Sequence, residues 1–409
     1  MQAGVSIETP ASWVVAFACL AILSVTYGAP LVIVVALKPI AADLDVPRSV
    51  PALASALASF GTGLGGMPLG WLAERFGVRR TTIFGGLMAA AGLMVATTGG
   101  EWGLYVGYGL LLGFLGNGAM NAPLMTYVSR WFDRRRGTAL ALITSGQYVA
   151  GAIWPTLFEL GTEHYGWRTT SIAFGVIEAV VIVPLAFIFL RAPPAQPLAG
   201  GMGAGPLVGA RILGLKPNLV MILLASAIFL CCVPMAQPSV HLVSFCTDLG
   251  FSPAHGAAML SVLLGCAFIS RQFWGWVGDK IGGLWSILLG SACQAVTLAL
   301  FLTTQDEIGL FAISAAFGLG FAGIVPNYIL TLRELFPASE AGWRVPVVVF
   351  GGLLGMAVGG WMGGAVYDAF GSYAPSFAIG VGSNLLNLGV IGFLLLRVPR
   401  RRPVMLVQA

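Results

Sequence analysis

The sequence predicts an all-α membrane protein with twelve transmembrane helices arranged as two pseudo-symmetric six-helix halves. Three observations predict this fold: a very apolar composition, twelve long segments nearly free of charge, and a motif that recurs half a chain apart. Of the 409 residues, 57% are hydrophobic and 9% are charged, whereas a soluble domain carries roughly a quarter charged residues. A chain with so few charged residues cannot form a surface that faces water on all sides. Much of it must therefore be surrounded by lipid.

Twelve segments are each long enough to cross about 30 Å of hydrocarbon at roughly 1.5 Å per residue. Full charges occur inside only two of them, as Glu178 in the sixth and Arg271 in the eighth. Their predicted limits are 12–37, 49–73, 81–100, 102–129, 137–158, 169–190, 217–240, 256–278, 281–305, 308–332, 345–367 and 369–396.

The basic residues predict how the spans are oriented. Of the 21 lysines and arginines, only Lys38, Arg48 and Arg168 fall in one set of alternating loops. Arg271 lies within a span, and all the others fall in the opposite loops and the carboxyl-terminal tail. Because basic loops stay on the cytoplasmic side, both termini are predicted to be cytoplasmic, in a bacterial-type plasma (inner) membrane. The formal charge of +5 therefore reflects topology, and nucleic acid is excluded as a partner.

The chain is predicted to divide into an amino-terminal half at 1–190 and a carboxyl-terminal half at 217–409. The segment 191–216 between them is rich in Pro, Gly and Ala and lacks a helical period, which is typical of a flexible linker. A motif at 70–77 (GWLAERFG) recurs at 275–282 (GWVGDKIG), an offset of 275 − 70 = 205 residues. This offset predicts parallel repeats with a substrate site between them near the bilayer midplane.

With these two motifs, the chain resembles the major facilitator superfamily of transporters along essentially its whole length. The first copy departs from the commoner pattern by having Glu74 in place of aspartate. The resemblance implies that the motif loops brace one face of the carrier during gating. The gating residues that it implies are Gly70, Glu74, Arg75, Arg79, Gly275, Asp279 and Lys280.

Arg271 is the most informative residue for substrate. Placing an arginine at the centre of a bilayer costs about 2.5–3.5 kcal/mol on insertion scales, so its side chain must meet water or a negative group. A guanidinium donates two parallel hydrogen bonds to a carboxylate, which makes Arg271 a candidate anchor for a small organic anion. The alternative is a structural arginine that snorkels to the interface or pairs with a glutamate.

The setting of Arg271 resembles the monocarboxylate transporters and the oxalate–formate exchangers. The similarity rests on the aromatic turn at 273–276 (FWGW) that follows it, on 134–137 (RRRG) and on 166–168 (GWR). The resemblance implies that Arg271 binds the substrate carboxylate. Two features depart from it: Ala267 stands where animal carriers have an aspartate, and 345–367 contains no lysine or arginine to serve as the second cation of an oxalate exchanger.

Other polar residues within the spans are candidates for the same cavity. Asn117 and Asn121 are four apart and so share one helix face, although they would equally serve as hydrogen-bonding contacts between helices. Tyr27 precedes a predicted break at 28–30 (GAP). The remaining candidates are Gln147, Tyr148, Gln237, Asn327 and Tyr328.

The favoured function is secondary active transport of a monocarboxylate by alternating access, with proton coupling or exchange. An oxalate or dicarboxylate exchanger and an efflux carrier for hydrophobic compounds compete with it. The sequence contains no nucleophile–base pair, phosphate loop or metal-ligand cluster, so we expect neither an enzyme nor a cofactor. The expected partners are a small organic anion, protons and the lipid bilayer, and the family default is a monomer.

Overall fold

A computed structural model describes residues 8–133, 135–191 and 211–398. Most of the predicted linker, Arg134 and the extreme ends of the chain lie outside these residues. The described chain is helical, apart from turns and an isolated bridge between Ile212 and Leu215. Its elements are α1 (Pro10–Thr26), α2 (Ala29–Val35), α3 (Leu37–Asp43), α4 (Ser49–Phe76), α5 (Val78–Ala96), α6 (Gly100–Leu104), η1 (Tyr105–Asn117), α7 (Gly118–Ser129), α8 (Arg136–Thr144), α9 (Gly146–Phe189), α10 (Pro217–Asp248), α11 (Pro253–Ile281), α12 (Gly283–Phe301), α13 (Glu307–Phe321), α14 (Ile324–Leu335), α15 (Ala338–Phe370) and α16 (Ala374–Leu396).

These helices make the twelve predicted crossings. Nine stretches of the described residues are long and apolar enough to span a membrane. One of the nine, Thr138–Phe189, holds two crossings because Gly166, with φ 79° and ψ 160°, turns the chain within α9. Helix α5 and the series α6–η1–α7 complete the set. Many of the helices outrun their predicted limits, as α10 does by reaching Asp248, because a helix continues beyond the hydrocarbon into the headgroup region.

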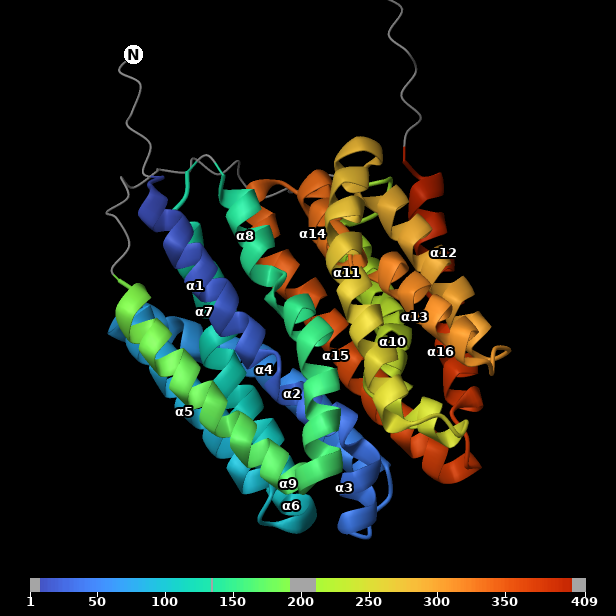
Figure 1. Ribbon diagram of the computed structural model, residues 1–409. Coiled ribbons are helices and arrows are strands. Elements are labelled where there is room, and N and C mark those ends of the chain that lie inside the picture. Colours follow the sequence, from blue (N-terminus) through green and yellow to red (C-terminus); the bar gives the residue numbers. More distant parts are fainter. Residues whose placement is uncertain (1–7, 134, 192–210, 399–409) are drawn as a thin grey trace, which may run out of the picture.

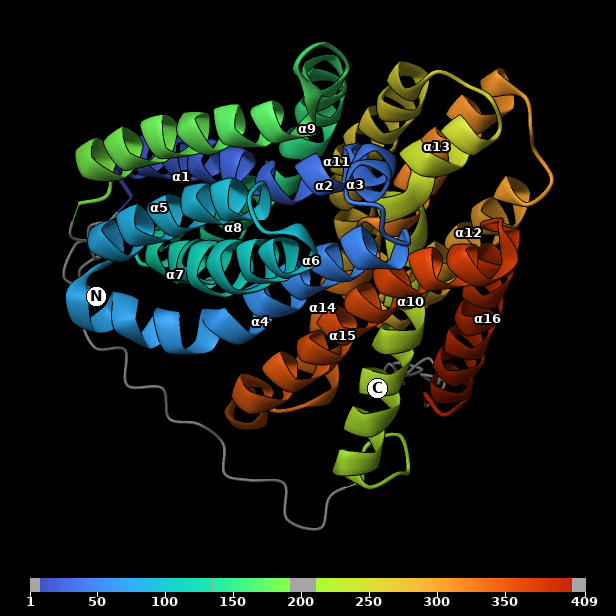
Figure 2. The same cartoon turned by 90° about the horizontal axis from the view of Figure 1, so that it is seen from below.

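The helices form two bundles that meet along a seam (Figure 2). One buried apolar cluster is drawn from residues between Val15 and Leu190. A second comes mainly from residues between Ile212 and Leu394, with Val34 and Tyr148 reaching into it from the first bundle. Helix α4 packs on α15 and helix α9 packs on α11 across the seam. Helix α1 begins and helix α16 ends at the same face of the molecule, which is called the terminal face (Figure 1). Helices α3 and α6 lie at the opposite face, which is called the distal face.

The repeat predicted from the sequence has matching backbone geometry. Gly77 ends α4 with φ 89°, and Gly282 ends α11 with φ 86°. The two glycines are 282 − 77 = 205 residues apart, and each is followed at once by the next helix. A side chain disfavours this φ, so the final glycine of each motif serves the same sharp turn in both halves.

Two local irregularities position the polar residues near the seam. The first span breaks as predicted, since α1 ends at Thr26 and α2 begins at Ala29. Gly28 lies in that break against Trp154 and Phe174, where an added Cβ would be 2.7 Å from either ring. The fourth span is π-helical from Tyr105 to Asn117, a form that often marks functional positions.

Close packing within the amino-terminal half depends on glycine. A Cβ added to Gly65 on α4 would lie 2.1 Å from the carbonyl oxygen of Phe114 on η1. Backbones approach this closely only where a side chain is missing. We therefore predict that Gly65→Ala lowers the thermal unfolding midpoint of the detergent-purified protein by several degrees, because overpacking costs typically 1–3 kcal/mol.

Gly392→Ala on α16 is the matched control, since an added Cβ there meets nothing within 4 Å. It should leave the midpoint unchanged or raise it slightly. Equal midpoints for the two variants would contradict the packing described for Gly65.

Candidate functional site

Arg271 lies on α11 about one turn past the midpoint of this helix, roughly 15 Å from its end at the terminal face. Its side chain is half-buried and faces the seam. The guanidinium carbon lies 5.6 Å from the centroid of the Tyr148 ring on α9. Within the described residues Arg271 forms no ion pair and no hydrogen bond. A full positive charge at this depth is therefore left without a protein acid.

The amino-terminal half supplies the polar wall opposite Arg271. Tyr27 lies at the break between α1 and α2, with its hydroxyl beside the Asn121 amide and within electrostatic range of Arg271 and Tyr148. The Tyr148 hydroxyl donates to the carbonyl oxygen of Ala322 across the seam at 3.4 Å. Spans one, four, five and eight thus bring Tyr27, Asn121, Tyr148 and Arg271 together between the halves.

Two side-chain oxygens near this wall have no partner. The Oδ1 atoms of Asn117 and Asn121 are buried and accept no hydrogen bond within the described residues. An unsatisfied buried amide oxygen costs about 1–3 kcal/mol. These oxygens are therefore poised for a donor, such as a substrate hydroxyl or an ordered water.

The structure separates the other predicted cavity residues from this group. Tyr328 is fully buried and donates its hydroxyl to Asn387 at 2.7 Å. Asn327 donates to the carbonyl oxygens of Trp274 at 3.2 Å and Gly323 at 2.8 Å. Both side chains are occupied inside the carboxyl-terminal half. Gln147 is half-buried on α9 beside Tyr148, on a different face of the helix.

The distal face is closed by ion pairs that cross the seam. Asp248 at the end of α10 accepts hydrogen bonds from Lys38 at 2.8 Å and from the Nη2 atom of Arg48 at 2.8 Å. Asp368 on α15 accepts from the backbone N–H groups of Arg48 and Ser49 at 2.9 and 2.8 Å. A carboxylate at these N–H groups also stabilises the first turn of α4. These five residues are called the distal latch.

Aromatic rings extend the distal latch into the carboxyl-terminal half. The Arg48 guanidinium lies 3.7 Å from the centroid of the Tyr367 ring and donates to the Tyr373 hydroxyl at 3.2 Å. A cation over an aromatic face contributes about 0.5–2 kcal/mol, depending on its exposure. One arginine thus contacts both acidic and aromatic groups of the opposite half.

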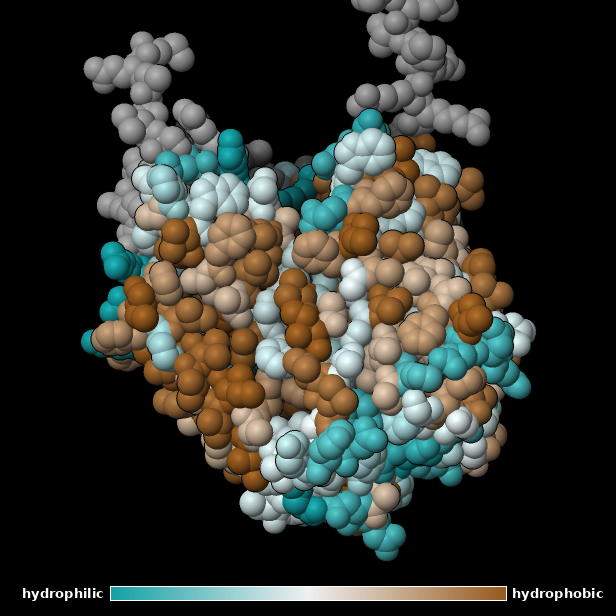
Figure 3. Space-filling view, viewed as in Figure 1, coloured by the Kyte–Doolittle hydropathy of each residue, from teal (hydrophilic) through white to brown (hydrophobic). Residues whose placement is uncertain are grey.

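The terminal face is hollowed between the two halves (Figure 3). Two charged pairs on this side of the molecule, Glu74 with Arg130 at 2.9 Å and Glu340 with Arg344 at 2.8 Å, each lie within one half. In the motif loops Arg75 lies over the Trp71 ring and Lys280 over the Trp276 ring. Ion pairs thus join the two halves across the seam at the distal face, whereas the terminal face is hollowed between them.

Two buried titratable side chains lie apart from Arg271. Glu178 on α9 is fully buried, and neither carboxyl oxygen has a partner within the described residues. His241 is fully buried inside α10, and its Nε2 atom lies 2.7 Å from the carbonyl oxygen of Gly360. The sequence predicts that this span ends at 240, whereas α10 continues for about two more turns, to Asp248.

Sequence reasoning did not single out the residues of the distal latch. Arg48 and Asp248 are 200 residues apart, so no local pattern connects them. A signal was nevertheless present, because Lys38 and Arg48 are two of only three basic residues in that set of loops. A base kept on the disfavoured side of a membrane suggests a specific acidic partner.

The fold and the central site define the class of protein: a multi-pass helical membrane carrier with a polar site between two six-helix halves. The family model of the Major Facilitator Superfamily matches residues 13–271 and 223–407 of the chain. The chain belongs to the Major Facilitator Superfamily. It is therefore a membrane transporter of small solutes rather than an enzyme.

Relatives and solved structures agree with this assignment. The chain is 27% identical over 362 residues to the Monocarboxylate transporter 13 of Bos taurus, covering 84% of this chain and 78% of that protein. It is 27% identical over 418 residues to the human Monocarboxylate transporter 11, covering 96% and 83% respectively. The solved nucleoside transporter NupG matches with a TM-score of 0.73 at 12% identity, over 93% of this chain and 98% of that chain. A likeness at this identity shows the shared fold.

The distal latch gives a test of conformation. Asp248→Asn removes the acid that Lys38 and Arg48 share, so the distal face should open more often. We predict a population at longer distance between spin labels at Glu101 and Gln305, on the distal ends of the two halves, measured by double electron–electron resonance after replacement of the six cysteines.

Glu307→Gln is the control, because Glu307 pairs with His255 inside one half. It should leave the distance distribution unchanged. The latch would be refuted if Asp248→Asn and the control gave the same distribution as the parent protein.

Proposed function

We propose that this protein is a secondary active transporter that moves a small monocarboxylate across the membrane by alternating access. The observation that carries the proposal is the unpaired Arg271 guanidinium at the seam, beside Tyr27, Asn121 and Tyr148. Such a charge is tolerated at this depth when an anion or water neutralises it. The planar guanidinium binds a carboxylate through two parallel hydrogen bonds. The similarity to monocarboxylate transporters 13 and 11 supports the same substrate class.

The buried basic residues favour a substrate with a single carboxylate. Arg344 is the one fully buried arginine of the described residues, at 3% exposure. Its guanidinium is already occupied by Glu340 at 2.8 Å and Asn218 at 3.0 Å. The segment 345–367 offers no lysine or arginine. A dicarboxylate would therefore bring one charge into the cavity without a counter-charge, at a large desolvation cost.

The proposed transport cycle has the two halves rocking about the central site. In the described conformation the distal latch is closed and the terminal face is open. In the other end state, the latch would separate and the two motif loops would approach. Gly70, Glu74, Arg75 and Arg79 in the first half, and Gly275, Asp279 and Lys280 in the second, would then brace the terminal face.

Coupling to protons or exchange for a second anion supplies the driving force in this proposal. The aspartate of animal relatives is replaced by Ala267 on α11, so a proton would need another carrier. In this proposal the terminal face lies in the cytoplasm, as the positive-inside rule predicts, and the protein acts as a monomer in a bacterial-type inner membrane.

The first test compares a carboxylic acid with its amide. In proteoliposomes, labelled lactate or pyruvate should accumulate under an inward proton gradient, whereas lactamide should neither be taken up nor compete. Arg271→Gln should lower carboxylate uptake about 10-fold or more, because a charge-assisted hydrogen bond contributes about 1.5–3 kcal/mol. Arg333→Gln, at the exposed end of α14, is the control and should keep full uptake.

The same vesicles separate the competing functions. Uptake that requires internal oxalate would instead indicate a dicarboxylate exchanger. Extrusion of a hydrophobic dye that is unaffected by Arg271→Gln would indicate an efflux carrier. Either result would contradict the monocarboxylate assignment. For the dye result, the Arg271→Gln protein must elute as a single folded species.

The second test places an acid inside the site. Asn121→Asp puts a fixed carboxylate beside Tyr27, within reach of the same cavity as Arg271, and this carboxylate should compete with the substrate. We predict that Asn121→Asp loses about an order of magnitude more uptake than Asn121→Ser, which keeps a small polar side chain. Equal uptake by the two variants would show that Asn121 and Arg271 do not share one site.

A further inference from the structure

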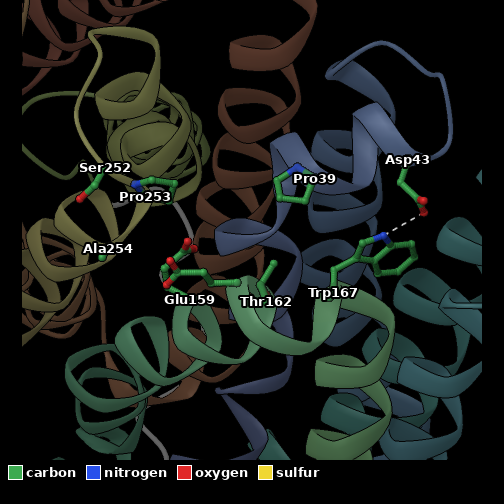
Figure 4. Close-up of a pocket in the computed structure, with 10 residues that line it drawn as sticks. Pro39, Asp43, Glu159, Thr162, Trp167, Ser252, Pro253 and Ala254 are labelled. Carbon is green, nitrogen blue, oxygen red and sulfur yellow. Dashed lines mark hydrogen bonds between the residues drawn. The ribbon is translucent and has the colours of Figure 1, made fainter.

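A cavity lies on the distal face, far from Arg271. It has a volume of about 420 Å³ and opens at the level where several helices end, close to the expected boundary between hydrocarbon and headgroups. The amino-terminal half supplies most of its wall, and the start of α11 lines it from the other half (Figure 4). The lining residues are Pro39, Asp43, Glu159, Thr162, Glu163, Gly166, Trp167, Ser252, Pro253 and Ala254. This cavity is called the distal pocket.

Glu159 is the unusual residue of the distal pocket. Its side chain is 7% exposed, and Figure 4 shows it on the side of the pocket that faces Pro253 and Ala254. Within the described residues, Glu159 accepts no hydrogen bond and forms no ion pair. The nearby Thr162 hydroxyl oxygen is fully buried and has no partner within the described residues. A carboxylate is rarely buried in this way unless a cation or hydrogen-bond donors satisfy it.

The charge around the distal pocket is negative. Glu163 follows Glu159 by one helical turn on α9, so the two carboxylates repel each other on one face. Asp43 is already neutralised, because Arg168 and the indole N–H of Trp167 both donate to it. Glu159 and Glu163 therefore have no counter-charge among the residues that the structure describes, in a cavity lined by both halves.

The shape of the distal pocket favours an organic cation over a bare metal ion. Within the described residues, no three acidic, histidine or cysteine side chains converge closely enough to hold a metal. The cavity is many times larger than a metal ion and has Pro39, Trp167 and Pro253 in its walls. A binding site of this size, apolar with a few converging polar groups, is typical of small organic ligands.

We propose that the distal pocket binds a small organic ammonium group, with the Glu159 and Glu163 carboxylates as its counter-charge. The ammonium donates hydrogen bonds to the two carboxylates, and the Thr162 hydroxyl accepts a further one. Because the pocket has walls from both halves, an occupant stabilises the closed distal face. The proposal concerns a site separate from the transport cavity and does not depend on the identity of the transported solute.

An organic ammonium group could come to the distal pocket from two sources. The pocket lies at headgroup level, where the ammonium of a phosphatidylethanolamine lipid would reach it. A free small amine in solution would present the same group. The experiment therefore uses free ethanolamine in detergent in one arm, and nanodiscs of phosphatidylethanolamine, phosphatidylcholine or phosphatidylglycerol in the other.

The readout is the thermal unfolding midpoint of the full-length protein, so transport activity is not needed. Millimolar ethanolamine in detergent, or phosphatidylethanolamine in nanodiscs, should raise the midpoint by a few degrees relative to sodium chloride or phosphatidylglycerol. Glu159→Gln should abolish this shift, and Glu163→Gln should reduce it. Glu101→Gln, an exposed acid on the same face outside the pocket, should leave it intact.

Each alternative outcome is distinct. Equal stabilisation by sodium and ethanolamine would indicate a site for any monovalent cation and would overturn the ammonium assignment. Suppose that Glu159→Gln unfolds at a higher temperature than the parent and that ethanolamine shifts the midpoint of neither protein. Glu159 would then be only a protonated buried carboxyl, and the proposal would be wrong. A parent protein that does not take up lactate in vesicles would contradict the proposed function and would leave the assignment of the distal pocket unaffected.

Discussion

A single unpaired charge governs the polar organisation of this protein. Arg271 sits near the middle of α11, and no acid of the described chain meets it. Because hydrocarbon cannot hold a bare guanidinium, the side chain must face a wet, polar space. The seam between the halves provides that space, with Tyr27, Asn121 and Tyr148 on its far wall. The need for an anion at this point links the architecture to the proposed cargo.

The seam is also where the two halves must move. Within each half, glycines let the backbones pack tightly, as Gly65 does against Phe114 and Gly355 does against Phe229. Across the seam the contacts include replaceable polar pairs such as Lys38 with Asp248. Exposed or half-exposed ion pairs are individually weak, so the distal latch can open without disrupting either bundle. Rigid halves joined by weak latches are what alternating access requires.

Much of the fold follows from composition and periodicity. The twelve spans, the break after Thr26 and the glycine turns at Gly77 and Gly282 were all predictable, because each depends on local chemistry. Arg271 stood out for the same reason, since a charge in an apolar run is visible without a structure. The boundaries were less accurate because helices such as α10 extend past the hydrocarbon.

The sequence could not show which way the polar side chains face. Tyr328 and Asn327 resemble cavity residues by composition, yet hydrogen bonds to Asn387 and Trp274 occupy them inside one half. Helical periodicity gives the relative face of two residues but not the neighbour that each face meets. Likewise the distal latch joins residues 200 or more apart in the chain, and only the tertiary fold brings them together.

The most direct measurement is a side-chain-resolution cryo-electron microscopy map of the protein with a saturating short monocarboxylate. The account predicts carboxylate density in contact with both terminal nitrogens of Arg271, close to Tyr148. A map in which that guanidinium points to the lipid headgroups, or is bound to a protein acid with and without the carboxylate, would contradict it.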